Sequence, residues 1–289
     1  MTGTPSSSEL AAAPPRRQSR LRATLWRIVP PLAFFVLFVG LLYLVSYVLL
    51  SPQRQFLPPP PHDVVKNGLL DGRNLHEQLR ALWDTGKVAL IGLAIAFVIG
   101  TSLAILMSQA KWIERSLYPY AVIVQVTPIL AVVPLIALWF GYDIQARVVV
   151  CVLISIFPII TNTLHGLVTV DSNLHDLFTL HHARRSARLV KLQLPHAIPD
   201  IFVGLRVSAG LSVIGAIVGE ISAGFGTQSF GLGYLITAAT GKLNTAYAFA
   251  AVICSTLLSL AIFATVSSIG AVILARWHIA APRSSTTNP

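Results

Sequence analysis

Charged residues are scarce in this 289-residue chain. Asp, Glu, Lys and Arg make up only 11% of it, whereas apolar residues make up 54% and the mean hydropathy is +0.71. A soluble globular domain carries roughly 25% charged residues, so the shortage excludes an ordinary soluble fold. The net charge of +10 does not indicate nucleic-acid binding, because basic residues of membrane proteins collect in cytoplasmic loops. The sequence therefore predicts a polytopic membrane protein with no nucleic-acid partner.

Several motifs that carry chemistry are also missing. Cys151 and Cys254 both fall in apolar runs, which suits small buried side chains and gives no disulfide framework. No GxxxxGK[ST] phosphate-binding loop occurs, so any use of ATP needs another subunit. His175 and His182 are seven residues apart and could share a helix face, but neither HExxH nor a Cys pair supports a metal site. We expect no cofactor and no metal on this chain.

Apolar runs of membrane-spanning length recur along the chain. About 20 such residues cross a bilayer core roughly 30 Å thick. The first run has 23 residues, longer than the roughly 7–15 of a signal peptide, and is interpreted as an uncleaved span. The sequence predicts an all-α fold of about six spans, at residues 28–50, 85–109, 117–140, 146–168, 202–224 and 246–274.

Prolines and glycines mark the irregular parts. Pro128 and Pro134 fall inside the third span and predict a kinked or broken helix within the bundle. Residues 225–245 are too broken by glycine to span, which predicts a re-entrant or surface segment. Asp63–Leu70 and Asn74–Trp83 are expected to form short amphipathic helices at the outer surface. Small residues three or four apart predict a close-packing face on the fifth span, namely Gly204, Ser208, Ala209, Gly210, Ser212, Gly215, Ala216 and Gly219.

Basic residues assign the orientation. With both termini inside, thirteen Lys and Arg residues fall in inner segments and five in outer segments, as the positive-inside rule requires. We therefore expect a disordered basic cytoplasmic tail over 1–24 and a first span with an outer amphipathic segment over 25–84. A transmembrane core follows over 85–276, with a cytoplasmic tail over 277–289.

Residues 171–200 form the longest polar interruption in the C-terminal two-thirds of the chain. They read DSNLHDLFTLHHARRSARLVKLQLPHAIPD and fall in the cytoplasm, between spans four and five. Asp176–Leu189 is expected to form an amphipathic helix outside the bilayer. Asp171 and Ser172 offer N-cap groups before it, and Leu194-Pro195 is expected to end the turn region.

This loop resembles the cytoplasmic EAA loop of permease subunits of bacterial ATP-binding-cassette importers. That motif runs Glu-Ala-Ala, three residues, Gly, nine residues and Ile-x-Leu-Pro. Aligned on Leu194-Pro195, its Ile position falls on Leu192 and its Gly position on His182. Because that glycine makes the bend between two short helices, the resemblance implies either an unusual backbone at His182 or a shifted bend. The Glu-Ala-Ala positions fall on Asp176, Leu177 and Phe178.

The resemblance covers about 55–276 and is to the branch that serves nitrate, sulfonate, taurine and related substrates. It is carried by the runs Phe56-Leu57-Pro58, Thr127–Gly141, Phe157–Leu167, Gly204–Ser208, Val218–Ile221 and Ser229–Ile236. It implies a non-enzymatic permease subunit of the bacterial cytoplasmic membrane that imports a small nutrient, such as a sulfonate, nitrate, taurine-like compound or vitamin precursor.

The resemblance also implies partners. They are two copies of an ATPase subunit that uses ATP, a second permease copy forming a homodimer, an extracytoplasmic substrate-binding protein and membrane lipid. The loop would act as the coupling helix that docks on the ATPase. The docking residues so implied are Asp176, Leu177, Phe178, His182, Ala183, Arg184, Arg185, Leu192, Leu194 and Pro195.

Polar side chains inside the spans are candidates for the substrate pathway or for hydrogen bonds between helices. Two other classes of function remain to be weighed. A membrane protease would need a Ser–His pair or two aspartates within spans, and the span interiors lack Asp. An ion-coupled carrier acting without an ATPase would need intramembrane acids, for which Glu220 is the single candidate. The pathway candidates are Gln125, Thr127, Asn162, Glu220 and Ser222.

Overall fold

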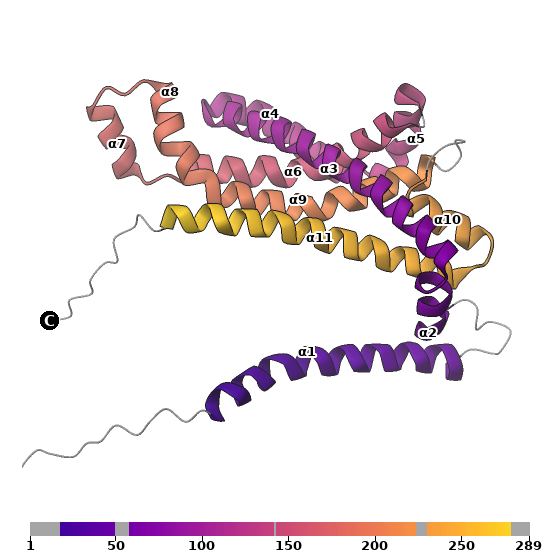
Figure 1. The fold of residues 1–289 in the computed structure, drawn as a ribbon. Helices are drawn as coiled ribbons and strands as arrows, with labels where there is room; N and C mark the ends of the chain where they lie inside the picture. Colours follow the sequence, from indigo (N-terminus) through magenta and orange to yellow (C-terminus); the bar gives the residue numbers. More distant parts are fainter. Residues whose placement is uncertain (1–17, 50–57, 142, 224–229, 279–289) are drawn as a thin grey trace, which may run out of the picture. The chain divides into compact units, whose positions relative to one another are not determined.

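The computed structural model describes residues 18–49, 58–141, 143–223 and 230–278. The chain divides into two compact units, Met1–Pro61 and His62–Pro289, and each is described by itself. Throughout the described residues every regular element is a helix (Figure 1), in agreement with the predicted all-α fold. The predicted tails 1–24 and 277–289, and Phe56-Leu57, lie wholly or largely outside the described residues.

The first unit contains one long helix. Helix α1 spans Gln18–Leu44 and continues as a π-helical turn, η1, over Val45–Leu49. Its stretch Val29–Val48 is long and apolar enough to cross a membrane, in agreement with the predicted first span. Most large apolar side chains of this stretch are exposed, as suits a surface that faces lipid.

The second unit is built on four long helices. They are α3, Gly72–Ser108; α6, Ile144–Val168; α9, Leu194–Ala223; and α11, Thr245–His278. All four contain a stretch apolar enough to cross a membrane. Figure 1 shows them running side by side between a loop end, where α7 and α8 lie, and a far end with α10.

The predicted third span is broken into two helices. Helices α4, Lys111–Val126, and α5, Ile129–Phe140, meet at an angle of 100°. The break lies at Thr127 and Pro128, where Thr127 has an extended backbone with ψ 127°. A residue before proline is pushed out of the helical region by the proline ring, so Pro128 is the physical cause. Counted as one broken span, the pair brings the described candidates to six, as predicted.

The shorter segments differ in part from expectation. Asn74–Trp83 is not a separate surface helix, because it forms the beginning of α3, which the Asp71 carboxylate caps by accepting from the Arg73 N–H at 3.0 Å. The stretch before it is helical, as α2 over Pro61–Asp63 and η3 over Val64–Leu69. Helix α10 has ten residues, Leu232–Gly241, and is about 15 Å long, too short to span.

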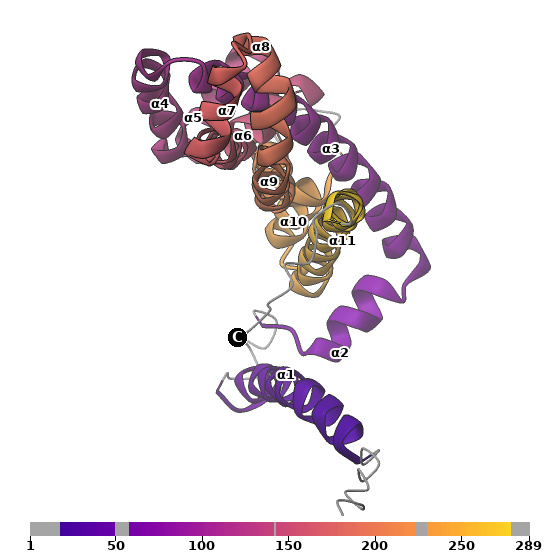
Figure 2. The ribbon, with the colours of Figure 1, turned by 90° about the vertical axis from the view of Figure 1, so that its left-hand side faces the viewer.

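Helices α3, α6 and α9 cross closely at Cys151. This cysteine is fully buried on α6, and a Cβ at Gly215 of α9 would lie 2.7 Å from its Cα. A Cβ at Gly92 of α3 would collide with the Cys151 side chain. Further along, the Ser208 hydroxyl donates to the Ser155 carbonyl at 2.6 Å. Of the predicted small-residue face of the fifth span, Gly204, Ser208, Gly215 and Gly219 therefore pack on α6, whereas Gly210 lies nearest Ser259 of α11. Figure 2 shows α9 beside α6 at the loop end.

We expect Gly215→Ala to lower the free energy of unfolding by about 1–3 kcal/mol, because the added methyl group meets the backbone of α6 and overpacks the crossing. The thermal unfolding midpoint of the detergent-solubilised chain measures this. Gly210→Ala on the same helix is the matched control, since its Cβ would meet only the Ser259 hydroxyl at 3.8 Å. Equal midpoints for the two variants would contradict the close crossing.

Candidate functional site: the polar loop and the buried carboxylate

The polar loop between α6 and α9 folds back on itself as two short helical arms. Helix α7 spans Ser172–Leu180, and the Asp171 carboxylate caps it by accepting from the backbone N–H two residues on, at 2.9 Å. Helix α8 spans Arg185–Arg188 and continues through η4, Leu189–Gln193, into α9. The predicted single helix Asp176–Leu189 is therefore wrong, because the chain reverses between α7 and α8 (Figure 1).

His182 makes this reversal. Its φ is 48°, in the left-handed region. Its N–H donates to the Thr179 carbonyl, and the Ala183 N–H donates to the Phe178 carbonyl, both at 2.9 Å. This pair of bonds is the Schellman motif, which usually has glycine at the left-handed position because a Cβ costs about 1–2 kcal/mol there. The bend therefore occurs at the residue aligned with the motif's glycine, and histidine adopts the unusual backbone.

The outer face of α7 exposes leucines. Leu174, Leu177 and Leu180 follow one another at three-residue intervals, so they share a face, and they are 42%, 48% and 78% exposed. The Arg188 guanidinium donates to the Thr179 hydroxyl at 3.0 Å, which ties the two arms of the loop together. The tip is thus a braced hairpin with an uncovered apolar face.

The base of the loop is packed, unlike its tip. Leu192 is buried, and Leu194 packs against an apolar cluster drawn from α3, α6 and α9. The predicted docking set divides accordingly. Leu192, Leu194 and Pro195 support the loop, whereas Phe178 and Ala183 are half-buried. The exposed members are Asp176, Leu177, His182, Arg184 and Arg185.

Leu194-Pro195 does not end the turn region as expected. A helix runs from Arg185 to Ser222, and this pair lies inside it. In an α-helix the proline ring clashes with the carbonyl four residues earlier. The π-helical turn Leu189–Gln193 comes immediately before, and its wider spacing makes room for the ring. The second arm of the loop is therefore a direct extension of α9.

The candidate pathway residues do not gather in one place. Gln125 is exposed on α4, and the Thr127 hydroxyl donates to the carbonyl four residues earlier at the break before α5. The Asn162 amide donates to the Pro158 carbonyl within α6 at 2.8 Å. Glu220 and Ser222 lie in the last turn of α9, further along the bundle. A pathway role for the set stays a prediction.

Glu220 is fully buried where α9, α3 and α10 meet. Its Oε2 accepts from the Thr85 hydroxyl at 3.0 Å and from the Gly233 N–H at 2.9 Å. The Thr85 hydroxyl in turn accepts from the Leu232 N–H at 2.9 Å. The side chains of Thr85 and Glu220 thus satisfy the first N–H groups of α10, which an α-helix cannot satisfy itself, and a carboxylate at a helix N-terminus is favoured by the dipole.

Two glycines, Gly231 just before α10 and Gly233 in its first turn, make this contact possible. A Cβ at Gly231 would collide with the Glu220 carboxylate, and a Cβ at Gly233 would lie 2.5 Å from the Ile217 carbonyl. Val218–Ile221 and Phe230–Gly233 are therefore packed against each other. Sequence reasoning missed Thr85 as the third partner, since nothing local connects it to an acid 135 residues away.

Two histidines connect α6 and α9. Within the described ranges, no three His, Cys, Asp or Glu side chains are placed to hold a metal ion. His196 has its Nδ1 3.0 Å from the Gly166 carbonyl, and the His165 ring lies 3.6 Å from the Asp200 carboxylate. These contacts join the end of α6 to the beginning of α9.

Comparison with known proteins agrees with this architecture. Residues 96–278 match the family model of the binding-protein-dependent transport system inner membrane component. The chain belongs to this family, in its nitrate and sulfonate branch, and is a multi-pass protein of the cytoplasmic membrane.

Three curated relatives illustrate the branch. The formylaminopyrimidine transport permease ThiX of Halalkalibacterium halodurans is 31% identical over 86% of this chain and 96% of that protein. The riboflavin transport system permease RibX of Chloroflexus aurantiacus is 33% identical over 59% of this chain and 62% of that one. The putative aliphatic sulfonates permease SsuC of Bacillus subtilis is 32% identical over 57% and 58%.

A solved structure has the same fold. The crystal structure of an amino acid ABC transporter with histidines superposes with a TM-score of 0.56 at 19% identity, covering 72% of this chain and 98% of that chain. At this identity the similarity concerns the fold alone.

We expect His182→Gly to preserve the loop and to stabilise its turn by about 1 kcal/mol, because glycine carries no Cβ penalty in the left-handed region. His182→Val should open the turn. Hydrogen–deuterium exchange over 172–188 reports both effects: deuterium uptake should be slower in His182→Gly and faster in His182→Val. His181→Gly, at a φ of −83°, is the control and should not slow exchange. Slower deuterium uptake in His182→Val than in the wild-type chain would disprove the assigned turn.

Glu220→Ala should destabilise the chain by about 2–4 kcal/mol, because it leaves the Thr85 hydroxyl and the Gly233 N–H buried without their acceptor. Glu220→Gln keeps one oxygen acceptor and should cost less. The readout is the thermal unfolding midpoint. Thr85→Val combined with Glu220→Gln should cost less than the sum of the single changes, since the three groups form one network. Additive effects would argue against the network.

Proposed function

We propose that this chain is the transmembrane subunit of an ATP-driven importer and that the hairpin α7–α8 is its docking element for a separate ATPase subunit. The observation that carries the proposal is the leucine face of α7. Leu174, Leu177 and Leu180 are exposed in a loop assigned to water, beside the exposed cations Arg184 and Arg185. An uncovered apolar face ringed by charge is typical of a protein–protein contact.

The base of the hairpin supports this role. Its second arm continues into α9 without a break from Arg185 to Ser222, so a push on the hairpin acts directly on a transmembrane helix. We propose that two ATPase copies act on two permease copies in this way. The substrate pathway then forms between the copies, with Gln125, Thr127, Asn162, Glu220 and Ser222 as candidate lining or supporting residues.

The cargo we propose is a small nutrient delivered by an extracytoplasmic binding protein. The names of the relatives include a formylaminopyrimidine, riboflavin and aliphatic sulfonates, which are all small organic molecules. A screen of such compounds against the binding protein that delivers to this chain identifies the cargo.

An ion-coupled carrier acting without an ATPase is the competing function. It needs an intramembrane acid that gains and loses a proton or binds an ion. The candidate acid, Glu220, is held by the Thr85 hydroxyl and the Gly233 N–H, which favours a structural role. Uptake that depends on ATP and persists when the proton gradient is dissipated supports the importer; uptake abolished by the uncoupler alone supports the carrier.

Leu177→Asn should reduce both ATPase binding and substrate uptake at least tenfold, because it removes an apolar contact at the centre of the leucine face. Co-purification of the ATPase subunit and ATP-driven uptake in proteoliposomes are the measurements. Membrane insertion should be unchanged, since the side chain is 48% exposed and lies in the loop outside the spans.

Leu243→Asn is the matched control. Leu243 is 64% exposed in the turn after α10, at the far end of the bundle, and its φ of 57° suits asparagine. The Leu243→Asn variant should bind the ATPase and transport substrate as the wild-type chain does. Full ATPase binding and uptake by Leu177→Asn would show that docking occurs elsewhere.

A further inference from the structure

A cavity of about 450 Å³ lies at the end of the bundle opposite the hairpin. It is formed by the beginning of α3, by Phe230 and α10, and by the beginning of α11. Its size is typical of a site for a small ligand. By the orientation that the basic residues assign, it opens on the extracytoplasmic side. None of the candidate pathway residues lines it.

Two cations without ion-pair partners line the cavity. Arg80 comes from α3 and Lys242 from the residue that ends α10. Among the described residues neither has a carboxylate within ion-pair distance, whereas the nearby Lys87 is paired with Asp84 at 2.7 Å. The acid of the cavity, Glu77, accepts from the Tyr247 hydroxyl at 3.2 Å. The cavity therefore presents an excess of positive charge.

Aromatic rings form the wall beside these cations. The Arg80 guanidinium carbon lies 5.1 Å from the centroid of the Phe230 ring, and the Tyr234 ring meets Phe230 edge to face at 6.3 Å. Tyr247 closes the cavity from α11. A flat apolar or aromatic group can lie against such rings while its charge reaches a cation beside them.

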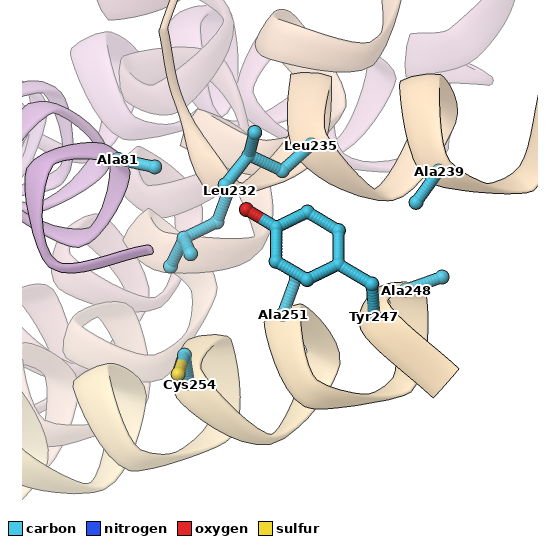
Figure 3. Close-up of a cluster of buried hydrophobic side chains, with 8 residues drawn as sticks. All are labelled: Ala81, Leu232, Leu235, Ala239, Tyr247, Ala248, Ala251 and Cys254. Atoms are coloured by element: carbon cyan, nitrogen blue, oxygen red, sulfur yellow. The ribbon is translucent and has the colours of Figure 1, made fainter. Parts of the chain in front are cut away.

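The floor of the cavity is rigid. Ala81, Leu235 and Ala239 line it and belong, with Tyr247, to a buried apolar cluster that joins α3, α10 and α11 (Figure 3). In Figure 3 the Tyr247 ring lies at the centre of this cluster. The rings and cations are thus mounted on packed helices, which is what a site needs to hold its geometry.

We propose that this cavity binds an oxyanion, such as a carboxylate, sulfonate or phosphate, carried on an apolar or aromatic body. Arg80 and Lys242 bind the oxyanion and the rings of Phe230 and Tyr234 cover the body. The chemistry is shared by a small organic anion from solution and by the headgroup of an anionic lipid. The proposal stands apart from ATPase docking, which occurs at the other end of the bundle.

Binding of benzenesulfonate to the full chain in phosphatidylcholine nanodiscs, measured by titration calorimetry, tests the proposal. We expect saturable binding. Arg80→Gln or Lys242→Gln should each weaken the affinity about tenfold or more, because each removes a charge-assisted hydrogen bond to the sulfonate. Phe230→Leu should weaken it less. The neutral isostere benzenesulfonamide should bind at least tenfold more weakly. Lys87→Gln is the matched control on α3 and should bind as wild type does.

A second experiment distinguishes the two sources of the anion. Nanodiscs that contain phosphatidylglycerol should still bind benzenesulfonate if the natural ligand is a solute. If the lipid headgroup is the occupant, phosphatidylglycerol suppresses that binding and co-purifies less with the Arg80→Gln, Lys242→Gln double variant. The proposal is overturned if neither anion binds saturably, or if the cavity variants and Lys87→Gln behave alike. Unchanged unfolding midpoints exclude misfolding as the cause.

Discussion

The close crossing of α3, α6 and α9 at Cys151 fixes the position of everything else in the second unit. In a bilayer no hydrophobic force drives helices together, so association depends on van der Waals contact and on hydrogen bonds between helices. The glycines that meet Cys151 provide the first, and the bond from Ser208 to the Ser155 carbonyl provides the second. With α6 and α9 so joined, the hairpin base and the Glu220 cluster are both positioned by one helix pair.

Within the bilayer no water is present to hydrogen-bond the backbone, and this explains why Glu220 is buried. Helix α10 begins among packed helices, and its first N–H groups need acceptors that no solvent supplies. Glu220 and Thr85 are those acceptors. A charge-bearing residue inside a span is ordinarily a sign of transport chemistry, but here its contacts are those of a helix cap. Gly231 and Gly233 allow the backbone at the beginning of α10 to come within reach of it.

Much of this architecture could be predicted from the sequence, because span length and proline position are properties of a single segment. The broken third span follows from Pro128, and the bend at His182 falls where the motif has glycine. The continuity of α9 through Pro195 could not be predicted, because a π-helical turn accommodates the ring. Nor could the partnership of Thr85 with Glu220, which depends on how distant segments pack. The proposed pathway between subunits involves surfaces that one chain presents only in part.

The uninterrupted helix from Arg185 to Ser222 has a mechanical consequence. Figures 1 and 2 show α8 at a steep angle to α9, so the 38 residues of this helix form an angled lever and not a straight rod. Contacts with α6 at Gly204, Gly215 and Gly219 hold its long arm. The π-helical turn Leu189–Gln193 joins the two arms, so the stiffness of that turn decides how much of a displacement at the hairpin reaches the bundle.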